Sequence, residues 1–238
     1  MTHDDRPTVA ANLDGQRALV AGAGHGAGPA VVAALRGAGA TLVVDEGHFD
    51  GLTELGRHEP AGLIDRAAEA LGGLDILVLS PPPVRNKPVL DMTPDELRTV
   101  VEAELTVPAL QMQAAARLMR KAGHGRIVAF MSMSGKAGVH HGVAPYAAAK
   151  GGMLTFMRVL AAETAGDGVT VNGIATALFE TQAATMTDEK RNRLRGQIPV
   201  GRFGTSEEAA HAVLYLTSPL AGFVTGECLN LSGGRFMD

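Results

Sequence analysis

The chain has 238 residues, of which 46% are hydrophobic and 19% are charged, and its formal net charge is −4. This composition supplies a substantial core but no basic surface, so we expect no nucleic-acid partner. No apolar run reaches the length of a membrane span, and the N-terminus lacks the order of a signal peptide. Cys228 is the only cysteine, which rules out an intrachain disulfide. We therefore expect a cytoplasmic protein without a membrane partner.

Strand patterns and helix patterns alternate along the chain, without a low-complexity linker or an internal repeat. We expect strands at residues 17–21, 41–45, 75–79, 126–131, 169–175 and 227–231, and helices at residues 27–37, 60–71, 94–121, 144–165 and 205–217. This alternation predicts the α/β class, with a doubly wound Rossmann-type parallel sheet in a single domain. The domain is expected to span residues 14–238, and residues 1–13 to form a flexible N-terminal tail.

A glycine-rich turn at residues 22–28 follows the first expected strand and opens the first expected helix. Glycines let the backbone approach a pyrophosphate, and the helix N-terminus offers free N–H groups. Asp45 and Glu46 end the second strand, where a carboxylate accepts a hydrogen bond from a ribose 2′-OH and repels a 2′-phosphate. We therefore expect a nicotinamide dinucleotide, with NAD(H) favoured over NADP(H). The alternative is a glycine turn chosen only for tight packing.

Tyr146 and Lys150 lie four residues apart on an expected helix, and Ser132 follows the strand before it. Side chains at this spacing share a helix face, and an ammonium beside a phenol lowers the pKa of the phenol. Such a phenol can exchange a proton with a substrate oxygen, which a nearby serine hydroxyl can hold. This apparatus suits hydride transfer to or from a carbonyl, although the tyrosine–lysine spacing alone is common on amphipathic helices.

The order of these motifs resembles the classical short-chain dehydrogenase/reductase family from residue 14 onward. The matching segments are Gly22, Gly26 and Gly28 for its glycine motif, residues 74–78 for its fourth strand, residues 125–128 for the start of its fifth, and residues 198–204, 225–227 and 232–234 for the tail of β-ketoacyl carrier-protein reductases. The resemblance implies a small-molecule carbonyl or alcohol substrate. It also implies a homotetramer or homodimer that pairs through the long helices at residues 94–121 and 144–165.

The resemblance further assigns roles to single residues. The catalytic candidates are Ser132, Tyr146, Lys150 and Glu104. The candidate cofactor contacts are Gly22, His25, Gly26, Ala27, Gly28, Asp45, Glu46, Ser80, Tyr146, Lys150 and Thr181, and the candidate substrate contacts are Ser132, His141 and Tyr146. For His25 and His141 a solvent-facing position is an open alternative. The histidines show no zinc-ligand spacing, so no metal site is expected.

Three departures from the family pattern stand out. Only residues 45–51 separate the second strand from residues 52–55, which resemble the third. A crossover helix does not fit there, so the domain is expected to be shortened between its second and fourth strands. Prolines at 81–83 stiffen the loop after Ser80, which borders the adenosine and the nicotinamide ribose in the family. Glu104 occupies the place of a catalytic Asn, where it either pairs with Lys150 or faces outward.

The favoured function is an NAD(P)-dependent oxidoreductase that interconverts a ketone and a secondary alcohol. Tyr146 would act as the general acid, Lys150 would tune it and hold the nicotinamide ribose, and Ser132 would orient the carbonyl oxygen. The alternative is a non-redox enzyme on the same fold, such as a halohydrin dehalogenase, which keeps the Ser–Tyr pair and has lost the cofactor site. The altered adenosine pocket favours this alternative, whereas Lys150 and Gly26 favour the oxidoreductase. A catalytically silent binding subunit has little support.

Overall fold

The computed structural model describes residues 11–46, 60–80, 87–137 and 141–237. Within them, one sheet of six parallel strands has the order β2-β1-β3-β4-β5-β6. The strands are β1 (Arg17–Ala21), β2 (Thr41–Asp45), β3 (Ile76–Leu79), β4 (Gly125–Ser132), β5 (Val169–Thr176) and β6 (Cys228–Leu231). The strand order reverses at β1, because β2 lies on one side of it and β3 on the other. The expected doubly wound Rossmann-type fold is therefore confirmed.

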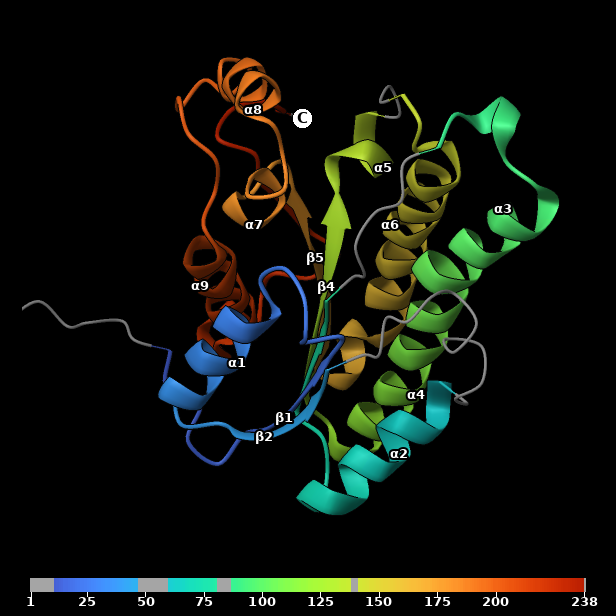
Figure 1. Cartoon of the computed structure of the whole chain (residues 1–238). Coiled ribbons are helices and arrows are strands. Elements are labelled where there is room, and N and C mark those ends of the chain that lie inside the picture. The colour runs from blue at the N-terminus through green and yellow to red at the C-terminus, as the bar shows by residue number, and fades with distance from the viewer. Residues whose placement is uncertain (1–10, 47–59, 81–86, 138–140, 238) are drawn as a thin grey trace, which may run out of the picture.

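Helices cover both faces of this sheet (Figure 1). On one face lie α1 (Gly28–Gly37) and α9 (Ser206–Thr217), and on the other lie α2 (Pro60–Leu71), α4 (Val107–Ala122) and α6 (Ala144–Thr164). Successive residues of a strand point to opposite faces, so Leu19 packs in the core under α2, α4 and α6, whereas Val20 packs in the core under α1 and α9. Burial on both faces explains why the central strands read as continuous apolar runs.

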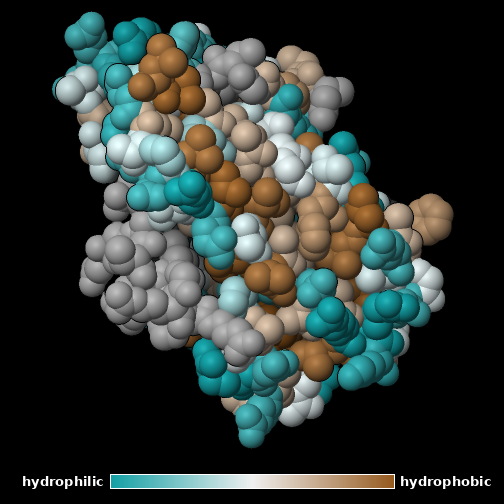
Figure 2. Space-filling model, turned by 90° about the vertical axis from the view of Figure 1, so that its right-hand side faces the viewer, coloured by the Kyte–Doolittle hydropathy of each residue, from teal (hydrophilic) through white to brown (hydrophobic). Residues whose placement is uncertain are grey.

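The outer surface of α3 (Pro94–Val101), α4 and α6 carries exposed apolar side chains. Figure 2, which views this side of the molecule, shows hydrophobic side chains gathered in the middle and hydrophilic ones around them. Leu97, Leu110 and Val159, one from each helix, are 43%, 41% and 52% exposed. We call these three residues the apolar face. Among the described residues, no helix is both long enough and apolar enough to span a bilayer.

The expected helix at residues 94–121 is present but changes from α-helical to π-helical for one turn. Thr93 caps α3 in a capping box with Glu96, and a π-helical turn, Glu102–Thr106, separates α3 from α4. Pro108 has no N–H to donate to the carbonyl of Glu104, so the α-helical ladder fails at this point. A π-helical turn inside a long helix absorbs such a break and rotates the side chains that follow it. The turn leaves Glu104 buried under α6.

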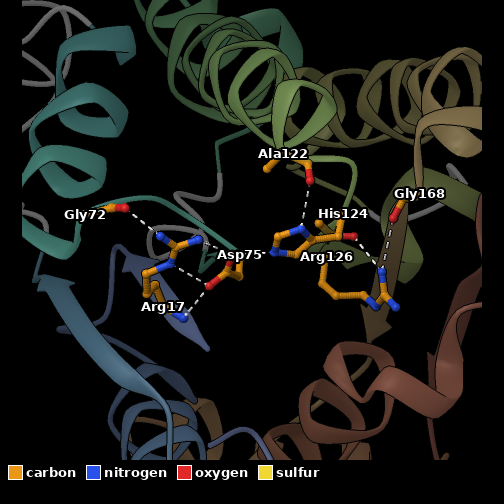
Figure 3. A network of polar contacts seen from close by, with 8 residues as sticks. Arg17, Gly72, Asp75, Ala122, His124, Arg126 and Gly168 are labelled. Atoms are coloured by element: carbon orange, nitrogen blue, oxygen red, sulfur yellow. Dashed lines mark hydrogen bonds and ion pairs between the residues drawn. The ribbon is translucent and has the colours of Figure 1, made fainter. Parts of the chain in front are cut away.

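At the amino ends of the strands, a polar network joins β1, β3 and β4 (Figure 3). Asp75, whose side chain is 3% exposed, accepts hydrogen bonds from the Nε and Nη2 atoms of Arg17 at 2.8 and 2.7 Å. His124 Nε2 lies 2.7 Å from the same carboxylate, and His124 Nδ1 lies 3.2 Å from the carbonyl oxygen of Ala122. Arg126 extends away from this group toward the carbonyls of Gly125 and Gly168. The network lies at the end of the sheet opposite the carboxyl ends of the strands.

Some expectations about local structure are wrong, and others concern residues that the structure does not describe. Leu13 is not part of a flexible tail, because it is fully buried and its N–H donates to the carbonyl of Ala38 at 2.8 Å. Three short helices, α5 (Met133–Ala137), α7 (Glu180–Ala183) and α8 (Asp188–Arg195), were not expected from the sequence. Residues 1–10 of the expected tail, most of the shortened segment between the second and fourth expected strands, and the prolines at 81–83 lie outside the described residues.

Candidate active site

Tyr146 and Lys150 project from the first turns of α6 toward the carboxyl end of β4. Their side chains are almost completely buried, with residue exposures of 7% and 4%. The Nζ atom of Lys150 lies 5.7 Å from the centroid of the Tyr146 ring. The predicted sharing of a helix face is therefore confirmed.

Ser132 is the last residue of β4 and lies beside the phenol. Its hydroxyl is close enough to the phenol to lower the pKa of Tyr146. The backbone N–H of Ser134 donates to Ser132 Oγ at 3.1 Å, which fixes the rotamer of the serine. Because the two side chains are neighbours, one substrate oxygen could contact both hydroxyls.

A glycine sets the distance between the serine segment and α6. The short helix α5 (Met133–Ala137) follows Ser132 and packs against α6 at Gly135. A Cβ atom on Gly135 would lie 2.7 Å from the Cβ and carbonyl carbon of Lys150, closer than real Cβ contacts. Only glycine permits this approach, which brings Ser132 within reach of Tyr146.

Lys150 is held by two further groups. Its Nζ atom donates to the backbone carbonyl of Phe130, in β4, at 3.1 Å. It also forms an ion pair with Glu104, whose Oε2 atom lies 2.9 Å away and whose residue exposure is 4%. Glu104 therefore faces inward and pairs with Lys150, as one of the two sequence-based alternatives predicted.

Burial and charge act on these groups in opposite directions. Burial alone would lower the pKa of Lys150, but the Glu104 carboxylate and the phenol outweigh it and raise that pKa, so the lysine stays charged. For Tyr146 the expected depression is wrong. Burial raises the pKa of the phenol, Lys150 and Ser132 lower it, and Glu104 raises it again, so the pKa lies above its ordinary value.

The glycine-rich turn lies between the carboxyl ends of β1, β2 and β3. A Cβ on Gly22 would meet the carbonyl oxygen of Ser80 at 2.3 Å, and one on Gly24 would meet that of Glu46 at 2.6 Å. Gly26 instead has φ +56 and open space where a Cβ would stand. The turn therefore packs closely against the ends of β2 and β3 at Gly22 and Gly24, and leaves its backbone open at Gly26, where a pyrophosphate could approach it.

The N-terminus of α1 directly follows this turn. Its N-cap residue, Ala27, makes no side-chain cap hydrogen bond, and Gly28 begins the helix fully buried. The N–H of Gly28 donates to the carbonyl of His25 and Pro29 has no N–H, so the positive end of the helix dipole, rather than a row of free N–H groups, would attract an anionic ligand. The carbonyls of Asp45 and Glu46 accept from the N–H groups of Ala23 and Gly24 at 2.8 and 2.9 Å, which places both acidic residues beside the turn.

The remaining candidates lie at the margins of this arrangement. His25 is partly buried in the glycine turn, and its carbonyl accepts from the N–H of Gly28 at 2.9 Å. His141 is exposed on the turn before α6, and Thr181 is exposed on α7. The structure thus gathers Ser132, Tyr146, Lys150 and Glu104 into one buried cluster but does not bring His141 or Thr181 into it.

One functional group was missed by sequence reasoning. The carbonyl of Phe130 holds the Lys150 ammonium, yet it belongs to the backbone, so no residue type marks it. The close contact at Gly135 had a signal, because a glycine three residues after the candidate serine is unusual inside a helix. No group of three or more metal-ligating side chains occurs within the described ranges.

Comparison with known proteins agrees with this geometry. The family model described as enoyl-(acyl carrier protein) reductase matches residues 57–235. The 3-oxoacyl-(acyl-carrier-protein) reductase FabG of Escherichia coli is 32% identical over 243 residues, covering 95% of this chain and 99% of that protein.

Solved structures give the same fold over nearly the whole chain. A gluconate 5-dehydrogenase from Burkholderia cenocepacia, in complex with NADP and tartrate, superposes with a TM-score of 0.85 at 29% identity, covering 95% of this chain and 97% of that one. A protein described as a dehalogenation enzyme superposes with a TM-score of 0.84 at 26% identity, covering 94% and 100%. The extent of the family match and of the reductase alignment shows that this chain belongs to the short-chain dehydrogenase/reductase family.

Proposed function

We propose that this oxidoreductase, which interconverts a ketone and a secondary alcohol with a nicotinamide dinucleotide, uses Tyr146 as its general acid and base. The observation that supports this most directly is the burial of Tyr146 and Lys150 side by side, with the Lys150 ammonium 5.7 Å from the centroid of the Tyr146 ring. Ser132 holds the substrate oxygen, and Tyr146 exchanges a proton with it. Lys150 stabilises the phenolate that forms when the proton leaves.

The residues of the glycine turn fit a dinucleotide. Gly22, Gly26 and the N-terminus of α1 would hold its pyrophosphate, and Asp45 would hold the adenosine ribose. When bound, the dinucleotide supplies or accepts the hydride at the substrate carbon, while Tyr146 balances the reaction by giving or taking the proton at the oxygen. Both parts of the site lie at the carboxyl edge of the sheet, because β1, β3 and β4 are parallel neighbours.

For the choice of cofactor we propose NAD(H). The Asp45 carboxylate stands at the end of β2, next to the glycine turn, where it favours a ribose 2′-OH over a 2′-phosphate. The gluconate 5-dehydrogenase relative binds NADP and does not support this preference. Calorimetric titration with NADH and NADPH decides the question. We expect tighter NADH binding and a smaller difference in Asp45→Asn, and tighter NADPH binding by the unaltered protein would refute the preference.

The catalytic proposal is tested by Tyr146→Phe. A panel of a 3-oxoacyl thioester, a cyclic ketone and a polyol, assayed with both dinucleotides, identifies a working substrate. On that substrate Tyr146→Phe should lower turnover by about 10²-fold or more, because the proton donor is lost. Dinucleotide affinity should change little. Near-normal turnover in Tyr146→Phe would show that another group transfers the proton.

The similarity to a dehalogenation enzyme supports testing a second, non-redox function. That enzyme supports a non-redox Ser–Tyr enzyme as the alternative, because it shares the fold over 94% of this chain. Lys150 argues against it, since a buried ammonium beside the phenol suits proton exchange coupled to hydride transfer. Release of halide from a vicinal halohydrin, without any dinucleotide, would favour the alternative over the oxidoreductase mechanism.

The apolar face supports a further proposal, namely a homodimer or homotetramer. Leu97, Leu110 and Val159 come from the helices expected to pair between subunits. A second copy of the chain, related by a two-fold axis, would cover the face with the same residues.

A further inference from the structure

We infer that Glu104 biases this enzyme toward carbonyl reduction near neutral pH, because its carboxylate offsets the Lys150 charge and keeps the Tyr146 hydroxyl protonated. The inference rests on the proposed function, since it concerns the same proton. To the proposed function it adds the favoured direction of the reaction, and it assigns Glu104 as a positioning residue that acts through Lys150.

The geometry places the carboxylate where it controls the lysine. Glu104 is 4% exposed on the π-helical turn, and its Oε2 atom lies 2.9 Å from Lys150 Nζ. A buried charge is stable only when it is paired, so each of these two groups holds the other ionised. The pair is neutral overall, and Lys150 therefore acts on the phenol with less net positive charge than it would beside an amide.

With the charges largely cancelled, burial decides the state of the phenol. The Tyr146 side chain lies in a site that disfavours phenolate, and the pKa of Tyr146 is raised by burial, lowered by Lys150 and raised again by Glu104. The hydroxyl is therefore protonated at neutral pH. Reduction uses this proton, whereas oxidation needs the phenolate to take the proton of the alcohol.

Other charged groups around α6 are directed elsewhere. Lys136 of α5 donates to the carbonyl of Cys228 and to Asn230 at 3.0 and 2.7 Å. Lys87, on the segment that precedes α3, is paired with Glu96 at 2.7 Å. Exposed His141 stands in solvent on the turn before α6. Among the described residues, the charges that act on the phenol are thus those of Lys150 and Glu104.

The chain offers an unusually clear optical test. It contains two tyrosines and no tryptophan, and the second tyrosine, Tyr215, is 49% exposed on α9. In a Tyr215→Phe protein, near-ultraviolet tyrosinate absorbance therefore reports on Tyr146 alone. The midpoint of its ionisation is measured in Tyr215→Phe and again after adding Glu104→Gln.

We expect Glu104→Gln to lower that midpoint by about one pH unit or more, since a buried charge close to the lysine is removed. The matched control is Glu102→Gln, which removes an exposed carboxylate from the same π-helical turn and should leave the midpoint unchanged. An unchanged midpoint in Glu104→Gln would overturn the inference. If the glutamine variant does not fold, Glu104→Asn takes its place, with circular dichroism as the check.

The kinetic counterpart uses the substrate found in the panel. In Glu104→Gln the acidic limb of the pH profile for alcohol oxidation should move to lower pH, while a merely structural defect would lower turnover at every pH. An unmoved limb would overturn the inference. The optical titration needs no turnover, so its result stands even if no ketone or alcohol substrate is found and the proposed function fails.

Discussion

Gly135 lacks a side chain, and the contact between α5 and α6 depends on that property. In Gly135→Ala the new methyl group would lie 2.7 Å from two carbon atoms of Lys150, so the two helices must move apart. Such overpacking costs about 1–3 kcal/mol of folding stability. Because Ser132 moves with α5, we expect turnover to fall by about 10²-fold, the effect of a displacement of about 1 Å in an active site.

Turnover and thermal unfolding of Gly135→Ala would be compared with those of Gly37→Ala. Gly37 ends α1, and a Cβ there meets no atom within 4 Å, so this control should keep its activity. If Gly135→Ala retains full turnover, the close approach of α5 is not what positions Ser132.

Part of the candidate site was predicted from the sequence, and part was not. Tyr146, Lys150 and Ser132 were predicted as one cluster, because their spacing and their places beside a strand are visible in the sequence. The ion pair of Glu104 was predicted as one of two alternatives. The direction in which the pKa of Tyr146 shifts was not predicted. It depends on the balance between burial and two opposing charges, and burial is a property of the folded chain.

At the scale of elements, the long periodic segments were predicted closely. The expected strand at residues 17–21 and the expected helix at residues 60–71 coincide with β1 and α2, because an apolar run and a 3.6-residue period are strong signals. The π-helical turn between α3 and α4 was not predicted from the sequence. The helix α8 has few apolar residues, so it shows no apolar period to detect.

The network of Arg17, Asp75 and His124 ties the amino ends of three strands together (Figure 3). Burial would raise the pKa of Asp75, but hydrogen bonds from Arg17 and His124 lower it from 3.8 to about 2. A carboxylate with a lowered pKa stabilises the fold above its unfolded-state pKa. This contribution, about 2 kcal/mol, is lost as the pH falls through the interval between the two values.

We therefore expect Asp75→Asn to lose about 2 kcal/mol of unfolding free energy at neutral pH and to show a weaker decline on acidification. Urea unfolding measured from neutral pH downward gives both quantities. Asp95→Asn is the control, because Asp95 pairs with Arg98 at an exposed position and such pairs contribute little. Equal acid sensitivity of Asp75→Asn and the unaltered protein would contradict the assignment.

At the scale of the whole molecule, the parallel sheet separates two kinds of polar group. Its carboxyl edge holds the glycine turn and the catalytic cluster, where Gly22 approaches Ser80 and Ser132 approaches Tyr146. Its amino edge holds the buried network around Asp75. Since all six strands run in one direction, a helix returns the chain to the amino edge between consecutive strands, and the loops that bind ligands collect at the other edge.

The apolar face gives the last prediction. Val159 is 52% exposed on α6. If two copies pair through this face, Val159→Glu buries a charge against its symmetry mate and should weaken association by about 30-fold, or about 2 kcal/mol. Light scattering over a concentration series should show a dimer or tetramer that dissociates at higher concentration in the variant. Leu90→Glu changes an exposed leucine outside the face and should leave the mass unaltered, whereas a monomeric unaltered protein at micromolar concentration would exclude the proposed assembly.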